Sequence, residues 1–133
     1  MKQQEPLSVF IADDSDSFRT SLKAVLGDIP GVNIVGEVSH AGQLMDKLFR
    51  LKPDLVILDI RMSGGNSFNV LKQIKKMIPS TIVSIITEYA FDLYYTKCLE
   101  LGADYFFDKS MEIERLIKTI GQMSHAHAQV TAV

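Results

Sequence analysis

Three aspartates follow apolar segments of the chain, at positions where they could act together. Asp13 and Asp14 come directly after the apolar run 7–12, and Asp59 lies near the end of the run 54–60. Carboxylates held close together repel one another unless a cation neutralises them, and their hard oxygens suit Mg²⁺. If the fold brings the ends of these two runs together, the three side chains could form a magnesium site.

A hydroxyl and an amine stand at two further run ends. Thr87 closes the run 81–87, and Lys109 follows the run 104–107. A metal ion and a nearby ammonium can together offset the negative charge on the oxygens of a transferring phosphoryl group. Asp59 stands alone at the end of its run, so its carboxylate could act as the nucleophile. The pattern predicts phosphoryl-transfer chemistry.

The elements that must position these groups alternate regularly along the chain. Five short apolar runs, bounded by Gly, Pro, Asp or Ser, are typical of buried strands, and segments with apolar residues at helical spacing separate them. This alternation predicts an α/β fold with a parallel sheet covered on both faces. In such sheets ligands bind at the carboxyl ends of the strands, where the groups above would meet. The expected strands are 7–12, 32–38, 54–60, 81–87 and 104–107, and the expected helices lie near 18–29, 44–51, 70–78, 91–101 and 113–120.

The length of 133 residues fits one domain. We expect this domain to occupy residues 1–123. The helical period is lost after that point, so we expect 124–133 to be a flexible C-terminal tail.

Composition argues against several classes of protein. The formal net charge is −2 and the sequence pI is near 5.9, so we expect no direct nucleic-acid binding by this chain. No apolar run approaches the roughly 20 residues that span a bilayer, so we expect no membrane association. The single cysteine, Cys98, cannot form an intrachain disulfide, which fits a cytoplasmic location.

Four motifs, taken together, resemble the receiver domain of two-component response regulators. They are IADDS, LVILDIRM, IIT and GADYFFDKS, in this order and each at the end of an expected strand. The resemblance covers about residues 7–122. It implies the flavodoxin-like fold, a (βα)5 three-layer sandwich whose five parallel strands have the order 2-1-3-4-5. It also implies a signalling phosphoprotein that receives its phosphoryl group from a sensor histidine kinase or a phosphotransfer protein.

The resemblance assigns the acidic residues to phosphorylation and metal binding. Asp59 would be the phosphoacceptor and a ligand of Mg²⁺. Asp14 would bind the ion directly, Asp13 would bind it mainly through water, and the backbone carbonyl of Arg61 would complete the protein ligands.

Three further residues match the switch positions of the family. Thr87 would donate a hydrogen bond to one phosphoryl oxygen, and Lys109 would pair with another. Phe106 stands at the aromatic switch position; it lacks a hydroxyl, so it could act only through packing. The resemblance implies that these residues remodel one face of the domain, formed by the fourth helix (91–101), the fifth strand (104–107) and the fifth helix (113–120). That face would bind a downstream output protein or domain, and it is also the candidate surface for a homodimer.

The chain departs from the family at several positions. Ser63 and Ser110 stand where receivers usually have proline, and Ser67 stands where glycine is usual. The proline at the position of Ser110 often follows a cis peptide bond. A cis bond before a residue other than proline costs about 3–4 kcal/mol, so we expect the Lys109–Ser110 bond to be trans or visibly strained.

Three residues next to the site motifs are expected to modulate phosphorylation. Glu88 replaces the small residue that usually follows the threonine, so it should hinder a phosphodonor or repel it by charge. Arg61 and Tyr89 each lie two residues beyond a site residue. We expect them to flank the phosphoryl group and to tune its lifetime.

Two other functions are compatible with these residues. The fold could serve as a phosphorylation-independent interaction module. Asp14-Ser15-Asp16 also resembles the DxD motif of haloacid-dehalogenase-type phosphatases, in which Asp14 would be the nucleophile, although such enzymes usually have a longer chain and a second acidic pair. As a receiver, the protein would not be an enzyme beyond its own phosphorylation and slow dephosphorylation. It would be either a free-standing receiver or the front end of a longer regulator.

Overall fold

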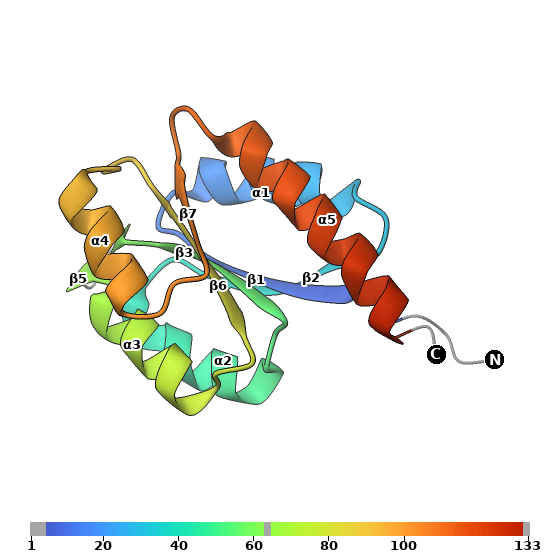
Figure 1. Ribbon diagram of the computed structural model, residues 1–133, viewed down its shortest axis with the longest axis horizontal. Coiled ribbons are helices and arrows are strands. Elements are labelled where there is room, and N and C mark those ends of the chain that lie inside the picture. Colours follow the sequence, from blue (N-terminus) through green and yellow to red (C-terminus); the bar gives the residue numbers. More distant parts are fainter. Residues whose placement is uncertain (1–4, 63–64, 132–133) are drawn as a thin grey trace.

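The computed structural model describes residues 5–62 and 65–131 (Figure 1). Its central sheet has five strands in the order β2-β1-β3-β6-β7, which corresponds to the predicted order 2-1-3-4-5. Every neighbouring pair in this sheet is parallel, so the carboxyl ends of the strands lie at one edge. Each strand lies within one residue of its predicted range. The strands are β1 (Leu7–Ala12), β2 (Val32–Val38), β3 (Leu55–Asp59), β6 (Ile82–Thr87) and β7 (Tyr105–Asp108).

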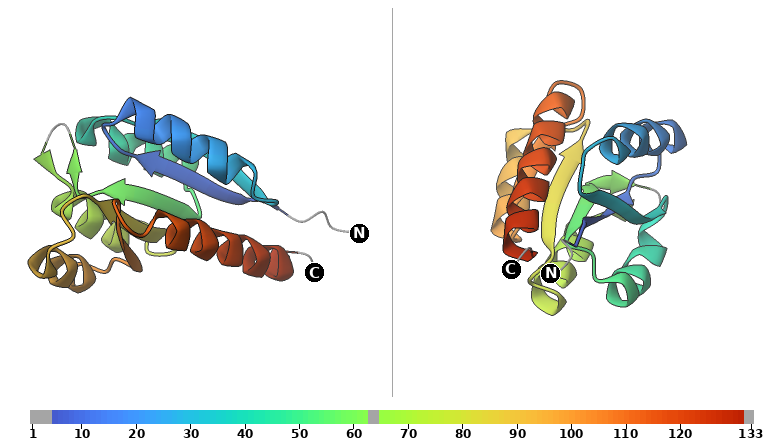
Figure 2. Two further views of the ribbon diagram at one scale, coloured as in Figure 1. Left: turned by 90° about the horizontal axis from the view of Figure 1, so that it is seen from above. Right: turned by 90° about the vertical axis from the view of Figure 1, so that its right-hand side faces the viewer.

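Five helices cover the two faces of the sheet, as the predicted three-layer sandwich requires. Helices α1 and α5 lie on one face and α2, α3 and α4 on the other (Figures 1 and 2). A short 3₁₀ turn, η1, precedes α2. The helices are α1 (Asp16–Gly27), α2 (Leu44–Leu51), α3 (Phe68–Met77), α4 (Asp92–Glu100) and α5 (Ile113–Thr131), and η1 is Ala41–Gln43.

Two apolar clusters hold the layers together. Successive residues of a strand point to opposite faces, so Val9 packs under α1 and α5 whereas Phe10 packs under α2, α3 and α4. Both residues are fully buried. Burial on both faces explains why the central strands read as continuous apolar runs rather than as alternating patterns.

Local signals mark the start of α1 and the end of α4. Ser15 is the N-cap of α1, and its side chain accepts a hydrogen bond of 3.2 Å from the backbone N–H of Phe18. Gly102 follows α4 with φ of +100°, a conformation that a residue with a Cβ rarely adopts. Ser15 therefore fixes where α1 leaves the edge that carries the predicted site residues, whereas Gly102 ends α4 at the opposite edge, before β7 begins.

The predicted flexible tail is corrected as far as residue 131, because α5 continues without a break to Thr131. The hydroxyl of Ser124 is buried and donates to the backbone carbonyl of Pro30 at 2.8 Å. The backbone N–H of Glu5 donates to Oγ1 of Thr131 at 3.3 Å. These anchors are polar, so the apolar period ends although the helix does not.

A small antiparallel pair after β3 was not predicted. It consists of β4 (Arg61–Met62) and β5 (Gly65–Asn66). The predicted departure at Ser63 lies outside the described residues. No described peptide bond is cis, so the Lys109–Ser110 bond is trans, as expected. Within the described ranges, no helix has both the length and the apolar character needed to cross a membrane.

Candidate functional site

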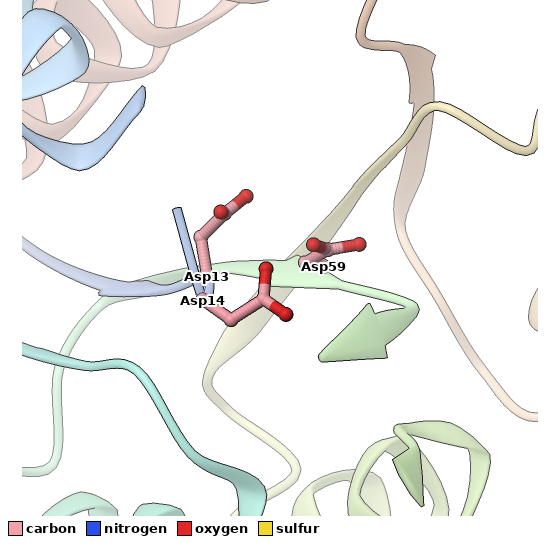
Figure 3. A group of neighbouring side chains, drawn as sticks. All are labelled: Asp13, Asp14 and Asp59. Atoms are coloured by element: carbon pink, nitrogen blue, oxygen red, sulfur yellow. The ribbon is translucent and has the colours of Figure 1, made fainter. Parts of the chain in front are cut away.

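Asp13, Asp14 and Asp59 converge at the carboxyl edge of the sheet (Figure 3). In the parallel register of β1 and β3, Ala12 pairs with Leu58, so the residues that follow them lie side by side. A carboxylate oxygen of each aspartate lies within 4.8 Å of one from each of the others. Asp13 and Asp59 are buried, with exposed fractions of 0% and 5%, and Asp14 is exposed. The cluster therefore combines two buried acids with one that solvent can reach.

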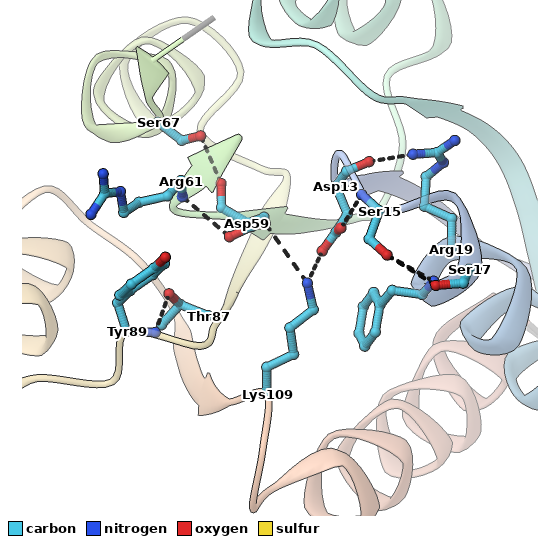
Figure 4. A network of polar contacts seen from close by, with 11 residues as sticks. Asp13, Ser15, Ser17, Arg19, Asp59, Arg61, Ser67, Thr87, Tyr89 and Lys109 are labelled. Carbon is cyan, nitrogen blue, oxygen red and sulfur yellow. Dashed lines mark hydrogen bonds and ion pairs between the residues drawn. The ribbon is translucent and has the colours of Figure 1, made fainter. Parts of the chain in front are cut away.

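Lys109 lies against this cluster (Figure 4). Its Nζ is 2.7 Å from Oδ2 of Asp13 and 3.8 Å from Oδ2 of Asp59. The backbone N–H of Lys109 donates to the carbonyl of Thr87 at 2.8 Å, which fixes the residue at the end of β7. The ammonium also lies 4.1 Å from the centre of the Phe18 ring, a cation–π contact that shields it from water. The lysine is thus nearly buried beside two aspartates.

The electrostatics of the cluster leave negative charge in excess. Burial, and after it the charge of Asp13, raise the pKa of Asp59 to about 7. Lys109 and the hydrogen bond from the backbone of Arg61 act in the opposite direction, and Asp14 adds a smaller upward contribution. Three carboxylates beside one ammonium offer hard oxygen donors with too little neighbouring positive charge. These oxygens could hold a divalent metal ion.

The residues after Asp59 fix the end of β3. The backbone N–H of Arg61 donates to Oδ1 of Asp59 at 3.1 Å. The guanidinium of Arg61 lies 4.8 Å from the centre of the Tyr89 ring, a second cation–π contact. This contact joins the loop after β3 to the loop after β6.

An open cavity of about 370 Å³ leads to the cluster. The three predicted flanking residues, Arg61, Glu88 and Tyr89, line this approach to Asp59. Glu88 and Tyr89 are both exposed. The cavity is lined by Asp14, Ser15, Asp59, Arg61, Met62, Glu88, Tyr89 and Lys109.

Thr87 and Phe106 do not belong to the cavity lining. Thr87 is buried at the end of β6, and its Oγ1 accepts a hydrogen bond of 2.9 Å from the backbone N–H of Tyr89. Phe106 is partly buried on β7 and meets the ring of Tyr95 edge to face, with the ring centres 5.4 Å apart. Thr87 is therefore buried and does not line the cavity, whereas Phe106 packs against Tyr95 of α4.

Sequence reasoning missed Arg19, which supports the aspartate cluster from α1. Its Nη1 donates to the backbone carbonyl of Asp13 at 2.6 Å, and its Nε donates to Oε1 of Glu37 at 3.0 Å. Arg19 also pairs with Asp16. Only 9% of the residue is exposed. Its position three residues before buried Leu22 places it on the apolar face of α1, and that spacing was the available signal.

Ser67 is the other residue whose contact with the site was not foreseen. It is fully buried, and its Oγ donates to the backbone carbonyl of Asp59 at 2.7 Å. The sequence showed only that a serine replaces the usual glycine. It gave no indication of where the hydroxyl points.

Comparison with known proteins agrees with this fold. The family model described as the response regulator receiver domain matches residues 9–121. The match covers most of the chain, which therefore belongs to the receiver domain family of two-component response regulators.

Curated relatives and solved structures support this assignment. The nitrate/nitrite response regulator protein NarL of Escherichia coli (strain K12) is 30% identical over 122 residues, which cover 92% of this chain and 56% of NarL. A protein-glutamate methylesterase/protein-glutamine glutaminase of Methanospirillum hungatei is 33% identical over 122 residues, covering 90% of this chain and 35% of that enzyme. The chain thus spans about half the length of NarL and a third of the methylesterase.

Among solved structures, the signal receiver domain of a DNA-binding response regulator from Colwellia psychrerythraea 34H is 27% identical. It has a TM-score of 0.81 and covers 90% of this chain and 98% of its own. This likeness extends over nearly the whole of both chains, so the sheet order and the helix layers described above are those of a receiver domain.

Proposed function

We propose that this receiver domain accepts a phosphoryl group on the carboxylate of Asp59 and thereby switches a protein-binding surface. The donor would be the phosphohistidine of a sensor histidine kinase or of a phosphotransfer protein. The observation that carries the proposal is the position of Asp59. Its carboxylate lies on an open cavity, 3.8 Å from the Lys109 ammonium and beside two further carboxylates.

Mg²⁺ fits the donor set of this site. Asp13, Asp14, Asp59 and the backbone carbonyl of Arg61 would hold it, because hard carboxylate and carbonyl oxygens are the ligands it prefers. Three carboxylates cluster beside Lys109, whose single charge does not balance theirs. When bound, the ion would neutralise charge on the acceptor carboxylate and on the phosphoryl oxygens.

The chain's own residues would have separate roles in the transfer of the phosphoryl group. A carboxylate oxygen of Asp59 would form the new O–P bond while the N–P bond of the phosphohistidine breaks and its electron pair returns to the imidazole. Lys109 would pair with one phosphoryl oxygen. Oγ1 of Thr87 accepts from the backbone of Tyr89, so its hydroxyl proton could donate to another. Beyond this step and slow hydrolysis of the acyl phosphate, we propose no enzymatic activity.

The proposed output surface is the face formed by α4, β7 and α5. Phe106 contacts Tyr95 of α4 through ring packing, so a movement of one ring would shift the other. This face would bind the output protein or domain, or a second copy of the chain. We place the protein in the cytoplasm, where sensor kinases present their phosphohistidines.

Modification with acetyl phosphate tests the proposal. The protein is incubated with the donor with and without Mg²⁺, and the acyl phosphate is trapped by borohydride reduction and mapped by mass spectrometry. We expect modification of Asp59 that requires Mg²⁺, is lost in Asp59→Asn and persists in the control variant Asp28→Asn, which alters an exposed aspartate. Modification of Asp14 instead would indicate phosphatase-type chemistry. Absence of both Mg²⁺ binding and modification would indicate a phosphorylation-independent module.

A further inference from the structure

Ser67 donates hydrogen bonds to the backbone of Asp59 and Ile60, the two residues at which the chain leaves β3. Its Oγ donates to the carbonyl of Asp59 at 2.7 Å, and its backbone N–H donates to the carbonyl of Ile60 at 2.8 Å. Its own carbonyl accepts the N–H of Leu71, which begins the hydrogen bonding of α3. One fully buried residue therefore joins the first turn of α3 to the peptide of the proposed phosphoacceptor.

The direction of the Ser67 hydroxyl is unusual for its place in the helix. Ser67 is the N-cap of α3, where a serine side chain commonly accepts a hydrogen bond from the first turn. Ser15 does so at the start of α1. Ser67 makes no such capping bond and donates to Asp59 instead. The hydroxyl thus bonds the end of β3 rather than the first turn of α3.

The Ser67 bond completes the restraint of Asp59. The side chain of Asp59 is held through Oδ1 by the N–H of Arg61 at 3.1 Å, and its carbonyl is held by Ser67. The carboxylate cannot turn away from Asp13 and Lys109 without breaking the part-buried hydrogen bond from Arg61, and the buried bond from Ser67 holds the backbone from which the side chain extends. A carboxylate that is already oriented needs no rearrangement when it binds a metal ion or attacks a phosphoryl donor.

We propose that Ser67 is a positioning residue for Asp59, whose hydroxyl sets the orientation of the acceptor carboxylate for Mg²⁺ binding and phosphorylation. This role rests on the proposed function of Asp59. On the opposite side of the cluster, Arg19 donates to the carbonyl of Asp13 in the same manner. Both strand ends that carry buried carboxylates are therefore held by a side-chain donor to the backbone.

The test compares two serines that make the same kind of bond. Ser67 and Ser124 are both buried, and each donates its hydroxyl to a backbone carbonyl, at 2.7 Å and 2.8 Å. Ser124 contacts Pro30, outside the residues that form the site. The variants are Ser67→Ala, Ser67→Thr and Ser124→Ala. The measurements are the Mg²⁺ dissociation constant by isothermal titration calorimetry, the rate of modification by acetyl phosphate at saturating Mg²⁺, and the thermal midpoint.

We expect Ser67→Ala to weaken Mg²⁺ binding about tenfold, as is typical when a group that orients a metal ligand is removed. Ser124→Ala should bind Mg²⁺ as the wild type does, even though its thermal midpoint falls. Ser67→Thr keeps the hydroxyl and should retain tight binding. Equal Mg²⁺ affinities in the two alanine variants would overturn the positioning role, as would a folded Ser67→Thr that binds as weakly as Ser67→Ala. A wild type that neither binds Mg²⁺ nor becomes modified would overturn the proposed function itself, and the role of Ser67 with it.

Discussion

The ammonium of Lys109 lies 2.7 Å from Oδ2 of Asp13, close enough for a charge-assisted hydrogen bond. The distance from the same nitrogen to Asp59 is 3.8 Å. The lysine therefore neutralises Asp13 more fully than Asp59. Asp59, the proposed phosphoacceptor, is therefore the buried carboxylate whose charge Lys109 compensates less.

We expect Asp59→Asn to stabilise the metal-free protein at pH 8. Burial raises the pKa of Asp59 to about 7, so between about pH 4 and pH 7 the native state holds a proton that the unfolded chain has released. The wild type therefore loses stability as the pH rises through this window, by at most about 4 kcal/mol. The asparagine variant carries no such group, and its stability should vary less with pH.

Urea unfolding in EDTA at pH 5 and pH 8 measures this difference. The free energy of unfolding of Asp59→Asn should exceed that of the wild type most at pH 8, and the difference should be smaller at pH 5. Asp28→Asn, which changes an exposed aspartate, should follow the pH dependence of the wild type. Parallel pH profiles for Asp59→Asn and the wild type would contradict the prediction.

Glu88 should slow the reaction of small anionic phosphodonors. It is exposed and lines the cavity that leads to Asp59, so its charge repels the donor where the donor must enter. We expect Glu88→Ala to be modified by acetyl phosphate about two- to fivefold faster at low ionic strength, with a smaller difference at high salt. Glu88→Gln separates charge from size, and Glu100→Ala on α4 serves as the control. Equal rates for the wild type and both Glu88 variants would refute this barrier.

Cys98 should be unreactive in the native protein. It is fully buried on α4, and burial raises the pKa of its thiol to about 11. The thiolate is the reactive species, so labelling by a disulfide reagent at pH 8 should be about 100-fold slower in buffer than in urea. Comparable rates in the two conditions would instead show that α4 opens readily.

Two buried serines should respond to alanine substitution with opposite signs. The hydroxyl of Ser84, in the centre of β6, has no hydrogen-bond partner among the described residues. Ser84→Ala should therefore raise the free energy of unfolding by about 1 kcal/mol. Ser124→Ala breaks the bond to the Pro30 carbonyl and should lower it by about 1 kcal/mol. Chemical denaturation measures both, and destabilisation by Ser84→Ala would show that its hydroxyl has a partner in solution.

The sheet and the carboxylate cluster were predictable because they depend on strong local signals. A buried parallel strand reads as a short apolar run; Asp13 and Lys109 follow such runs, and Asp59 lies near the end of one. Parallel strands bring their carboxyl ends to one edge, so the convergence of these side chains follows from topology. No knowledge of individual contacts was needed to place them together.

The unpredicted features depend on contacts between distant residues. The two-residue strands β4 and β5 are too short to show any period. The direction of the Ser67 hydroxyl depends on where Asp59 lies in the folded chain. The last two turns of α5 are held by Pro30 and Glu5, which are about one hundred residues away or more. A pattern search along the sequence cannot detect such partners.

The length of α5 determines what can be joined to this domain without harm. The helix starts just after the site lysine and ends where Thr131 accepts a hydrogen bond from Glu5, at the opposite end of the sheet (Figure 2). Its 19 residues span about 28 Å. A fluorescent protein or affinity tag fused directly before Glu5 or directly after Thr131 would therefore sit far from the acidic cavity. A circular permutant that links Thr131 to Glu5 through a short loop should keep both the fold and an accessible Asp59.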